Sequence, residues 1–168
     1  MRELATRDSL LDLMRALGRE ADTESRVYFT GGASAVLLGW RETTIDADIR
    51  VIPESDRLFR AIPELKERLR VNIELASPPD FIPEVPGWRE RSLFISREGL
   101  LSFHHFDFYS QALAKIERGH AQDQSDVGSI PTRCGCSCLF LPWRFLPCPR
   151  LLKTVLNLAS GTRRTVRS

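Results

Sequence analysis

Acidic residues are absent from the last quarter of this sequence. None of residues 128–168 is Asp or Glu, although the stretch holds seven Lys or Arg, whereas residues 1–127 hold all 22 acids and 17 basic residues. At the usual acidic content of about one residue in eight, so long an acid-free run arises by chance in well under about 1% of cases. We hypothesise that the sequence from about residue 128 is out of frame, or otherwise unrelated to the part before it.

Cysteine is also absent before position 134. The four cysteines that follow do not show the paired spacing of a zinc site, and no His lies near them; they are Cys134, Cys136, Cys138 and Cys148. A disulfide framework is not expected in a cytoplasmic chain. Basic residues beside Trp143 and Phe145 would suit nucleic acid, but the stretch lacks helical or strand periodicity before Leu151. We therefore expect one domain over 1–127, followed by an atypical basic tail over 128–168, out of frame or disordered.

Long apolar runs are missing as well. No stretch of about 18 apolar residues occurs, so no membrane span is expected. The first twenty residues mix acids and bases and contain no uninterrupted apolar segment, which argues against a signal peptide. With 42% apolar and 27% charged residues, the composition is that of an ordinary globular protein. We expect a cytoplasmic location.

Apolar periodicity predicts an α/β fold, with a mixed sheet flanked by helices. Alternation indicates the strands 43–52 and 71–75, a short run of β-forming residues indicates 27–30, and apolar stripes at helical spacing indicate the longer helices. The expected strands are 27–30, 43–52, 71–75, 92–96 and 101–106. The expected helices are 4–17 (ending near Gly18), 33–38 (closed by Gly39), 54–70 (split or kinked at Pro63) and 110–118, with Leu113 and Ile116 facing inward. A proline-rich loop is expected over 77–87.

Two carboxylates lie on one face of the expected strand 43–52. Asp46 and Asp48 alternate with Ile45, Ala47 and Ile49. Their Cα atoms would be about 6.5 to 7 Å apart, so that their oxygens can converge on divalent cations of a two-metal site. Hard oxygen ligands favour Mg²⁺, which takes its remaining ligands from water and substrate phosphates. Asp-x-Asp alone is a common pattern, and two solvent-facing acids would look the same.

The segment before this pair strengthens the case. Gly31 and Gly32 follow a short strand and open a helix, which predicts backbone amides directed at an anion, with no β-carbon in the way. Ser34, in the first helical turn, could add a hydroxyl contact to phosphate, or serve helix packing instead. An anion-binding turn followed by a carboxylate pair supplies both halves of a nucleoside triphosphate site.

The segments Gly31-Gly32-Ala33-Ser34 and Thr43-Thr44-Ile45-Asp46-Ala47-Asp48-Ile49 resemble the signature of the DNA-polymerase-beta-like nucleotidyltransferase superfamily. The similarity covers about residues 25–127. It is closest to small bacterial members that include the AbiEii-toxin-like proteins of toxin–antitoxin systems. The resemblance implies that the glycine turn binds triphosphate, that Asp46 and Asp48 bind Mg²⁺, and that a third acid on a later strand completes the metal site.

Alternation on the expected strand 71–75 makes Glu74 our choice for this third acid, as metal ligand or as proton acceptor, with Asp107 as the rival. Lys115, together with Asp123-x-x-Asp126, resembles a pattern that follows the core in AbiEii-like members, and would neutralise triphosphate charge. Arg41 is a further candidate for phosphate contact. Each of these residues equally suits a solvated surface.

The leading hypothesis is an Mg²⁺-dependent nucleotidyltransferase that moves a nucleotidyl group from an NTP to an acceptor hydroxyl on RNA, protein or a small molecule. The alternative is a non-catalytic nucleotide-binding module, or one partner of a toxin–antitoxin pair. A third reading, nucleic-acid binding, rests on the basic tail.

Overall fold

The computed structural model describes residues 4–118. The chain divides into two compact units, the first of which is Met1–Glu117. The expectations for the tail, its cysteines, Asp123, Asp126 and the boundary after residue 127 lie outside the described residues. None of the helices in the described part combines the length and the apolar content that crossing a bilayer requires.

Helices and strands alternate along residues 4–118, which confirms the α/β class expected from the sequence. The elements are β1 (Ala5–Thr6), α1 (Arg7–Glu20), β2 (Ser25–Phe29), α2 (Gly31–Leu37), β3 (Thr43–Thr44), β4 (Asp46–Ile52), α3 (Asp56–Leu69), β5 (Asn72–Glu74), the 3₁₀ turn η1 (Pro78–Asp80), α4 (Trp88–Arg91), β6 (Phe94–Glu98), β7 (Leu101–His105) and α5 (Phe108–Arg118).

The main sheet is mixed and has the strand order β5-β4-β2-β7-β6. β2 runs antiparallel to β4 and parallel to β7, while β4 and β5 are parallel and β6 and β7 form an antiparallel hairpin. β1 and β3 form a separate antiparallel pair. Because β2 and β7 are parallel neighbours, the helices that follow them, α2 and α5, begin at the same end of the sheet.

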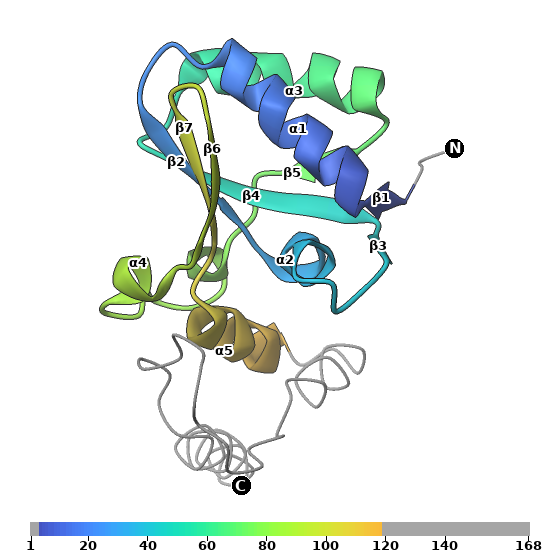
Figure 1. Cartoon of the computed structure of the whole chain (residues 1–168). Helices are drawn as coiled ribbons and strands as arrows, with labels where there is room; N and C mark the ends of the chain where they lie inside the picture. The colour runs from blue at the N-terminus through green and yellow to red at the C-terminus, as the bar shows by residue number, and fades with distance from the viewer. Residues whose placement is uncertain (1–3, 119–168) are drawn as a thin grey trace, which may run out of the picture. The chain divides into compact units, whose positions relative to one another are not determined.

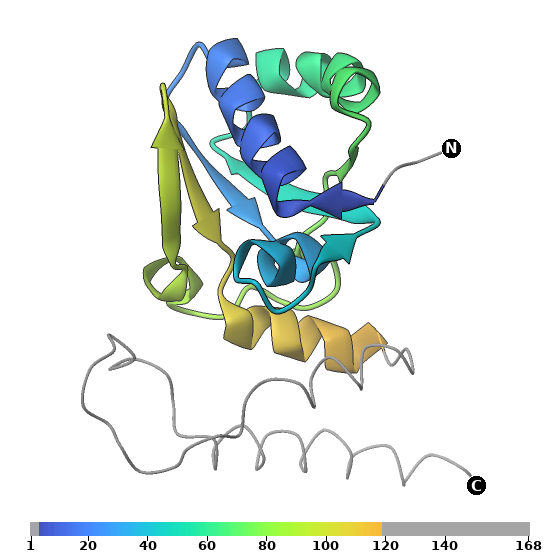
Figure 2. The ribbon, with the colours of Figure 1, turned by 45° about the vertical axis from the view of Figure 1, so that its right-hand side comes forward.

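One face of the sheet is covered by α1 and α3, as Figure 1 shows. The main core lies between these two helices and the sheet. Its fully buried side chains include Leu10, Leu13, Leu17, Phe29, Ile49, Leu58, Leu65, Ile73 and Phe103. A smaller cluster of Tyr28, Trp88 and Phe106 is separate from this core. Figure 2 shows α5 alongside α2, below the ends of the strands. On β4, Ala47, Ile49 and Val51 belong to the main core, so the aspartates that alternate with them lie on the opposite face of the sheet from α1 and α3.

Two helices differ from expectation. α1 does not end at Gly18 but continues to Glu20. A β-carbon on Gly18 would lie 2.7 Å from both Cβ and O of Glu98, so this glycine serves close packing against the β6–β7 hairpin and does not end the helix. α3 runs uninterrupted through Pro63, which is exposed. The carbonyl that loses its partner to proline can bind water there, and the expected split does not occur.

One apolar assignment was wrong, and another holds only in part. The expected strand 43–52 is interrupted between β3 and β4, and Ile45 at the interruption is 61% exposed instead of facing the core. The buried residues of α5 are Ser110, Gln111, Ala112 and Ala114, whereas Leu113 and Ile116 are half-buried. A helix that buries serine and glutamine beside another element does so because their polar groups find partners there.

Candidate active site

The turn after β2 lies against the carboxylate of Asp48. Phe29 pairs with Ile49 across the two strands, and the next residue, Thr30, donates its amide to the carbonyl of Asp48 at 3.0 Å. Gly31 then adopts φ +55°, and a β-carbon there would lie 3.1 Å from Asp48 Oδ2. The glycine and the carboxylate that the sequence analysis joined are therefore neighbours in space.

Gly32 has a different reason to be glycine. A β-carbon on it would lie 2.1 Å from Oγ1 and 2.9 Å from Cβ of Thr44 on β3. Real β-carbons do not approach other atoms so closely, so Gly32 is required by packing whether or not a ligand binds. Its amide belongs to the first turn of α2, where N–H groups have no carbonyl partner within the helix.

Asp46, Asp48 and Glu74 lie on one face of two neighbouring strands. Both aspartates are half-buried on β4, on either side of the fully buried Ala47. The parallel pairing with β5 sets Asp46 opposite Asn72, and Asp48 opposite Glu74. Glu74 is exposed on this edge strand, and Ile73 beside it is buried. The alternation inferred from the sequence therefore holds for all three acids.

Asn72 links two of these carboxylates. Its Nδ2 donates to Asp46 Oδ1 at 2.5 Å and to Glu74 Oε1 at 2.9 Å, so one amide nitrogen holds both oxygens nearby. The sequence alone assigned no role to Asn72. Alternation together with the parallel register would have identified it.

Within residues 4–118, no three His, Cys, Asp or Glu side chains converge closely enough to hold a metal ion by themselves. The oxygens of Asp46 and Asp48 are nevertheless the ligand type that Mg²⁺ prefers, and this ion commonly binds one or two carboxylates and takes its other ligands from phosphates and water. The donor set thus fits Mg²⁺ bound together with a nucleotide better than Mg²⁺ bound alone.

Asp107, the rival for the third acid, is engaged elsewhere. It is 1% exposed. Its Oδ1 accepts from Arg91 Nε at 3.1 Å, and its Oδ2 accepts from Arg91 Nη2 at 2.7 Å and from the amide and hydroxyl of Ser110. This bond to Asp107 raises the pKa of Arg91. Because both of its oxygens are in use, Asp107 anchors the start of α5 and is a poor metal ligand.

Ser34 is committed to packing. It is 1% exposed, and its Oγ donates to the carbonyl of Phe29 at 2.8 Å and lies 3.1 Å from His105 Nδ1. Burial, and secondarily His104, lowers the pKa of His105 to about 4, so this ring is neutral at pH 7. Because the Ser34 hydroxyl donates its proton to Phe29, the tautomer that satisfies this contact carries its proton on Nδ1. A hydroxyl placed in this way does not reach a phosphate, and we leave Ser34 out of the proposed contacts.

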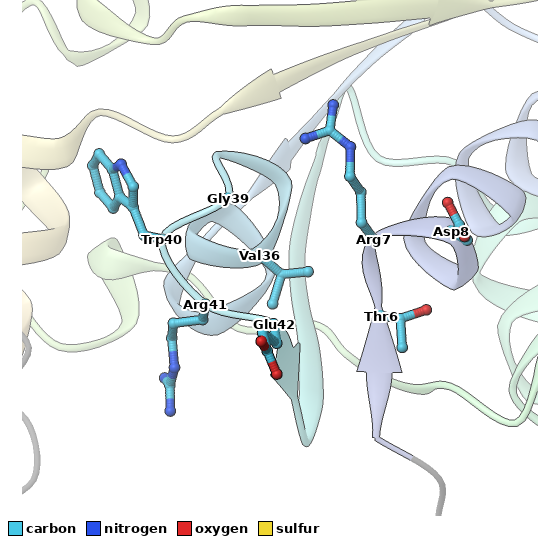
Figure 3. A pocket seen from close by; sticks show the side chains of 8 residues that line it. All are labelled: Thr6, Arg7, Asp8, Val36, Gly39, Trp40, Arg41 and Glu42. Atoms are coloured by element: carbon cyan, nitrogen blue, oxygen red, sulfur yellow. The ribbon is translucent and has the colours of Figure 1, made fainter.

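The two candidate phosphate-binding cations lie on different elements. Lys115 is half-buried on α5, one helical turn beyond Gln111 and on the same face. Arg41 lines an open groove of about 410 Å³ together with Arg7, Trp40 and Glu42, and Figure 3 shows Arg7 and Arg41 on opposite sides of it. None of the glycines or aspartates of the candidate site lines this groove.

Gln111 is a site neighbour that sequence reasoning missed. Its Oε1 accepts a hydrogen bond from the amide of Gly31 at 2.8 Å. The two residues are 80 positions apart, and no local pattern connects them. The Gly31 amide that was expected to face a phosphate is therefore occupied by a side chain of α5.

Comparisons of this chain with protein-family models, with curated proteins and with solved structures gave no match.

Proposed function

We propose that this protein is an Mg²⁺-dependent nucleotidyltransferase, which transfers a nucleotidyl group from an NTP to an acceptor hydroxyl. The hydroxyl oxygen bonds to the α-phosphorus as the bond to the β-phosphate breaks, and pyrophosphate leaves. One observation carries the proposal: the carboxylate of Asp48, on a strand that also bears Asp46, lies directly against the glycine turn at Gly31. A close approach of backbone to carboxylate brings amide donors and metal-binding oxygens to one place. An NTP needs the metal at its reacting phosphate and the amide donors at its outer phosphates.

The residues have distinct tasks under this proposal. Asp46 and Asp48 would hold Mg²⁺, which supplies charge neutralisation at the phosphates. The amide of Gly32, next to the occupied amide of Gly31, would donate to the outer phosphates, and Lys115 would add positive charge. Glu74, opposite Asp48 in the strand register, would accept the proton of the attacking hydroxyl. Most of the rate would come from positioning and electrostatics, since the protein forms no covalent intermediate.

A second candidate function is nucleotide binding without catalysis, as in an interaction module of a toxin–antitoxin pair. The observation that favours it is the exposure of Glu74 on an edge strand, where, among the contacts within residues 4–118, only the shared amide of Asn72 holds it. A proton acceptor so loosely held would contribute little to the rate. This candidate and the leading one make the same prediction for NTP binding and opposite predictions for transfer.

The test is transfer from NTPs labelled at the α-phosphate. The full-length protein is incubated with each of the four NTPs, with Mg²⁺ or Mn²⁺, and with total cellular RNA or protein as acceptor. We expect label in one acceptor class from the wild type, and a loss of at least about a hundredfold in Asp46→Asn and Asp48→Asn, because removing a principal electrostatic contributor to phosphoryl transfer costs roughly this much.

Glu64→Gln is the matched control. It makes the same change from carboxylate to amide on an exposed residue of α3, which pairs only with Arg68 among the described contacts. Its activity should equal that of the wild type. Metal-dependent NTP binding that is lost in both aspartate variants, with no transfer by the wild type, would favour the non-catalytic candidate. NTP binding that is absent from the wild type, or indifferent to Asp46 and Asp48, would refute both.

A further inference from the structure

Both ends of the Gln111 side-chain amide are bound. Oε1 accepts from the amide of Gly31 at 2.8 Å, and Nε2 donates to the carbonyl of Phe106 at 2.7 Å. The residue is 9% exposed. An amide side chain bound at both ends cannot rotate without breaking a buried hydrogen bond, so its oxygen is held at one point.

The element that carries Gln111 is itself anchored to the sheet at the glycine turn. The amide of Phe106 donates to the carbonyl of Phe29 at 2.8 Å, and this carbonyl also accepts from Ser34 Oγ. Gln111 and Ser34 thus connect the starts of α5 and α2 through residues at the ends of two parallel strands. The starts of both helices are held as one unit by hydrogen bonds that are largely buried.

Gly31 transmits this restraint to Asp48. Its φ of +55° is a conformation that glycine adopts without strain but does not hold by itself, and Gln111 binds the amide of this residue. Asp48 Oδ2 lies against the α-carbon of Gly31, at 3.1 Å from the place a β-carbon would take. A shift of Gly31 would therefore move the surface against which the carboxylate rests.

We propose that Gln111 is a positioning residue of the candidate active site, which holds Gly31 and through it sets the place of the Asp48 carboxylate. The inference rests on the proposed function, because a position for Asp48 matters to binding only if Asp48 binds metal with a nucleotide. It makes α5 part of the site, although no ligand contact is assigned to Gln111 itself.

The test compares the Mn²⁺-dependent binding of a non-hydrolysable ATP analogue by the wild-type chain, Gln111→Ala and Gln111→Met. The methionine variant keeps most of the side-chain volume and removes both hydrogen bonds, which separates their loss from the loss of packing. Residues that contact the metal ligands, and not the metal itself, typically contribute tenfold or more to metal affinity by orienting those ligands. We expect both variants to weaken binding by about tenfold or more, and amide hydrogen exchange at Gly31 to become faster by a similar factor.

Ser110→Ala is the matched control on the same helix. Ser110 is buried, and its hydroxyl bonds only to Asp107 among the described contacts, so the variant loses a buried hydrogen bond of α5 without touching Gly31. It should lose thermal stability and keep its affinity for the analogue. If folded Gln111→Met binds the analogue with an affinity within about twofold of the wild type, the role of Gln111 is overturned, while the proposed function stands. A wild-type protein that binds no non-hydrolysable analogue of any of the four NTPs would overturn the proposed function, and this inference with it.

Discussion

The carboxylate of Asp48 rests against the backbone of Gly31, with Oδ2 3.1 Å from the place that a β-carbon would take. The contact joins the end of β2 to the middle of β4, through the antiparallel pairing that sets Thr30 beside Asp48. Any side chain at position 31 would both strain the backbone and displace the carboxylate. The glycine is thus tied to the candidate site in a way that its neighbour, packed against Thr44, is not.

Gly31→Ala should lower both stability and ligand affinity. The positive φ costs an alanine of the order of 1 to 2 kcal/mol. The displaced carboxylate should weaken Mn²⁺–nucleotide binding as well. Gly39→Ala is the control, because Gly39 has φ +76° but nothing within 4 Å of an added β-carbon. Urea unfolding should show a similar loss of free energy of unfolding in both variants, and binding should fall only in Gly31→Ala. If Gly31→Ala and Gly39→Ala weakened binding equally, the contact between Gly31 and Asp48 would have no specific effect on the ligand.

Arg91→Ala should destabilise the fold strongly, because it leaves the fully buried Asp107 without its cation. Breaking such a pair costs about 3 kcal/mol, near the low end of the range because the Arg91 side chain is 24% exposed. Arg15→Ala breaks an exposed pair with Asp12 and should cost no more than about 0.5 kcal/mol in urea unfolding. A similar small loss in both variants would contradict the structural role assigned to Asp107.

Asp107→Asn separates that structural role from metal binding. The amide cannot accept all the hydrogen bonds that the carboxylate accepts from Arg91 and Ser110, so thermal stability should fall. Under conditions in which the variant is folded, its Mn²⁺–nucleotide affinity should stay within about threefold of the wild type, a change of roughly 0.65 kcal/mol. A loss of affinity as large as that of Asp48→Asn would restore Asp107 as a metal ligand and count against Glu74.

Acid should destabilise the protein partly through His105. Burial lowers its pKa to about 4 in the folded state, against an ordinary value near 6.5. Between these values the unfolded chain binds a proton that the folded chain does not, so the free energy of unfolding falls as the pH is lowered through this window. The slope for one such group is at most about 1.4 kcal/mol per pH unit.

His105→Asn tests this dependence, because its amide can still donate toward Ser34 Oγ and does not titrate. Urea unfolding at pH 7.5, 6 and 5 should show a smaller loss of stability toward acid in the variant than in the wild type. The pKa of His104 is also lowered, mainly by burial, but His104 is present in both proteins, so its contribution cancels in the comparison. Equal slopes would show that His105 has the same pKa in the folded and the unfolded chain, and would contradict the effect of its burial.

Local patterns determined much of this protein. Period-two alternation located the strands around Asp48 and Ile73, and set Asp46, Asp48 and Glu74 on one face, because side-chain direction along a strand depends only on the number of residues between two positions. The same logic failed where the strand was interrupted, at Ile45. A different local rule failed at Gly18, where the helix was expected to end. A glycine that ends a helix and a glycine that lets a hairpin pack closely look alike in sequence.

Only the tertiary structure decided which of the candidate residues lie together. Gly31 meets Asp48 through an antiparallel pairing, and meets Gln111 through a parallel strand and the helix after it. The sequence contains no record of either pairing, since hydrogen bonds between distant segments depend on strand order and register. Burial likewise assigned Ser34 and Asp107 to the scaffold, because whether a polar group is available to a ligand depends on the neighbours that have already bound it. The acids of the candidate site could be predicted from the sequence, whereas Asn72 and Gln111, which bind their neighbours, could not.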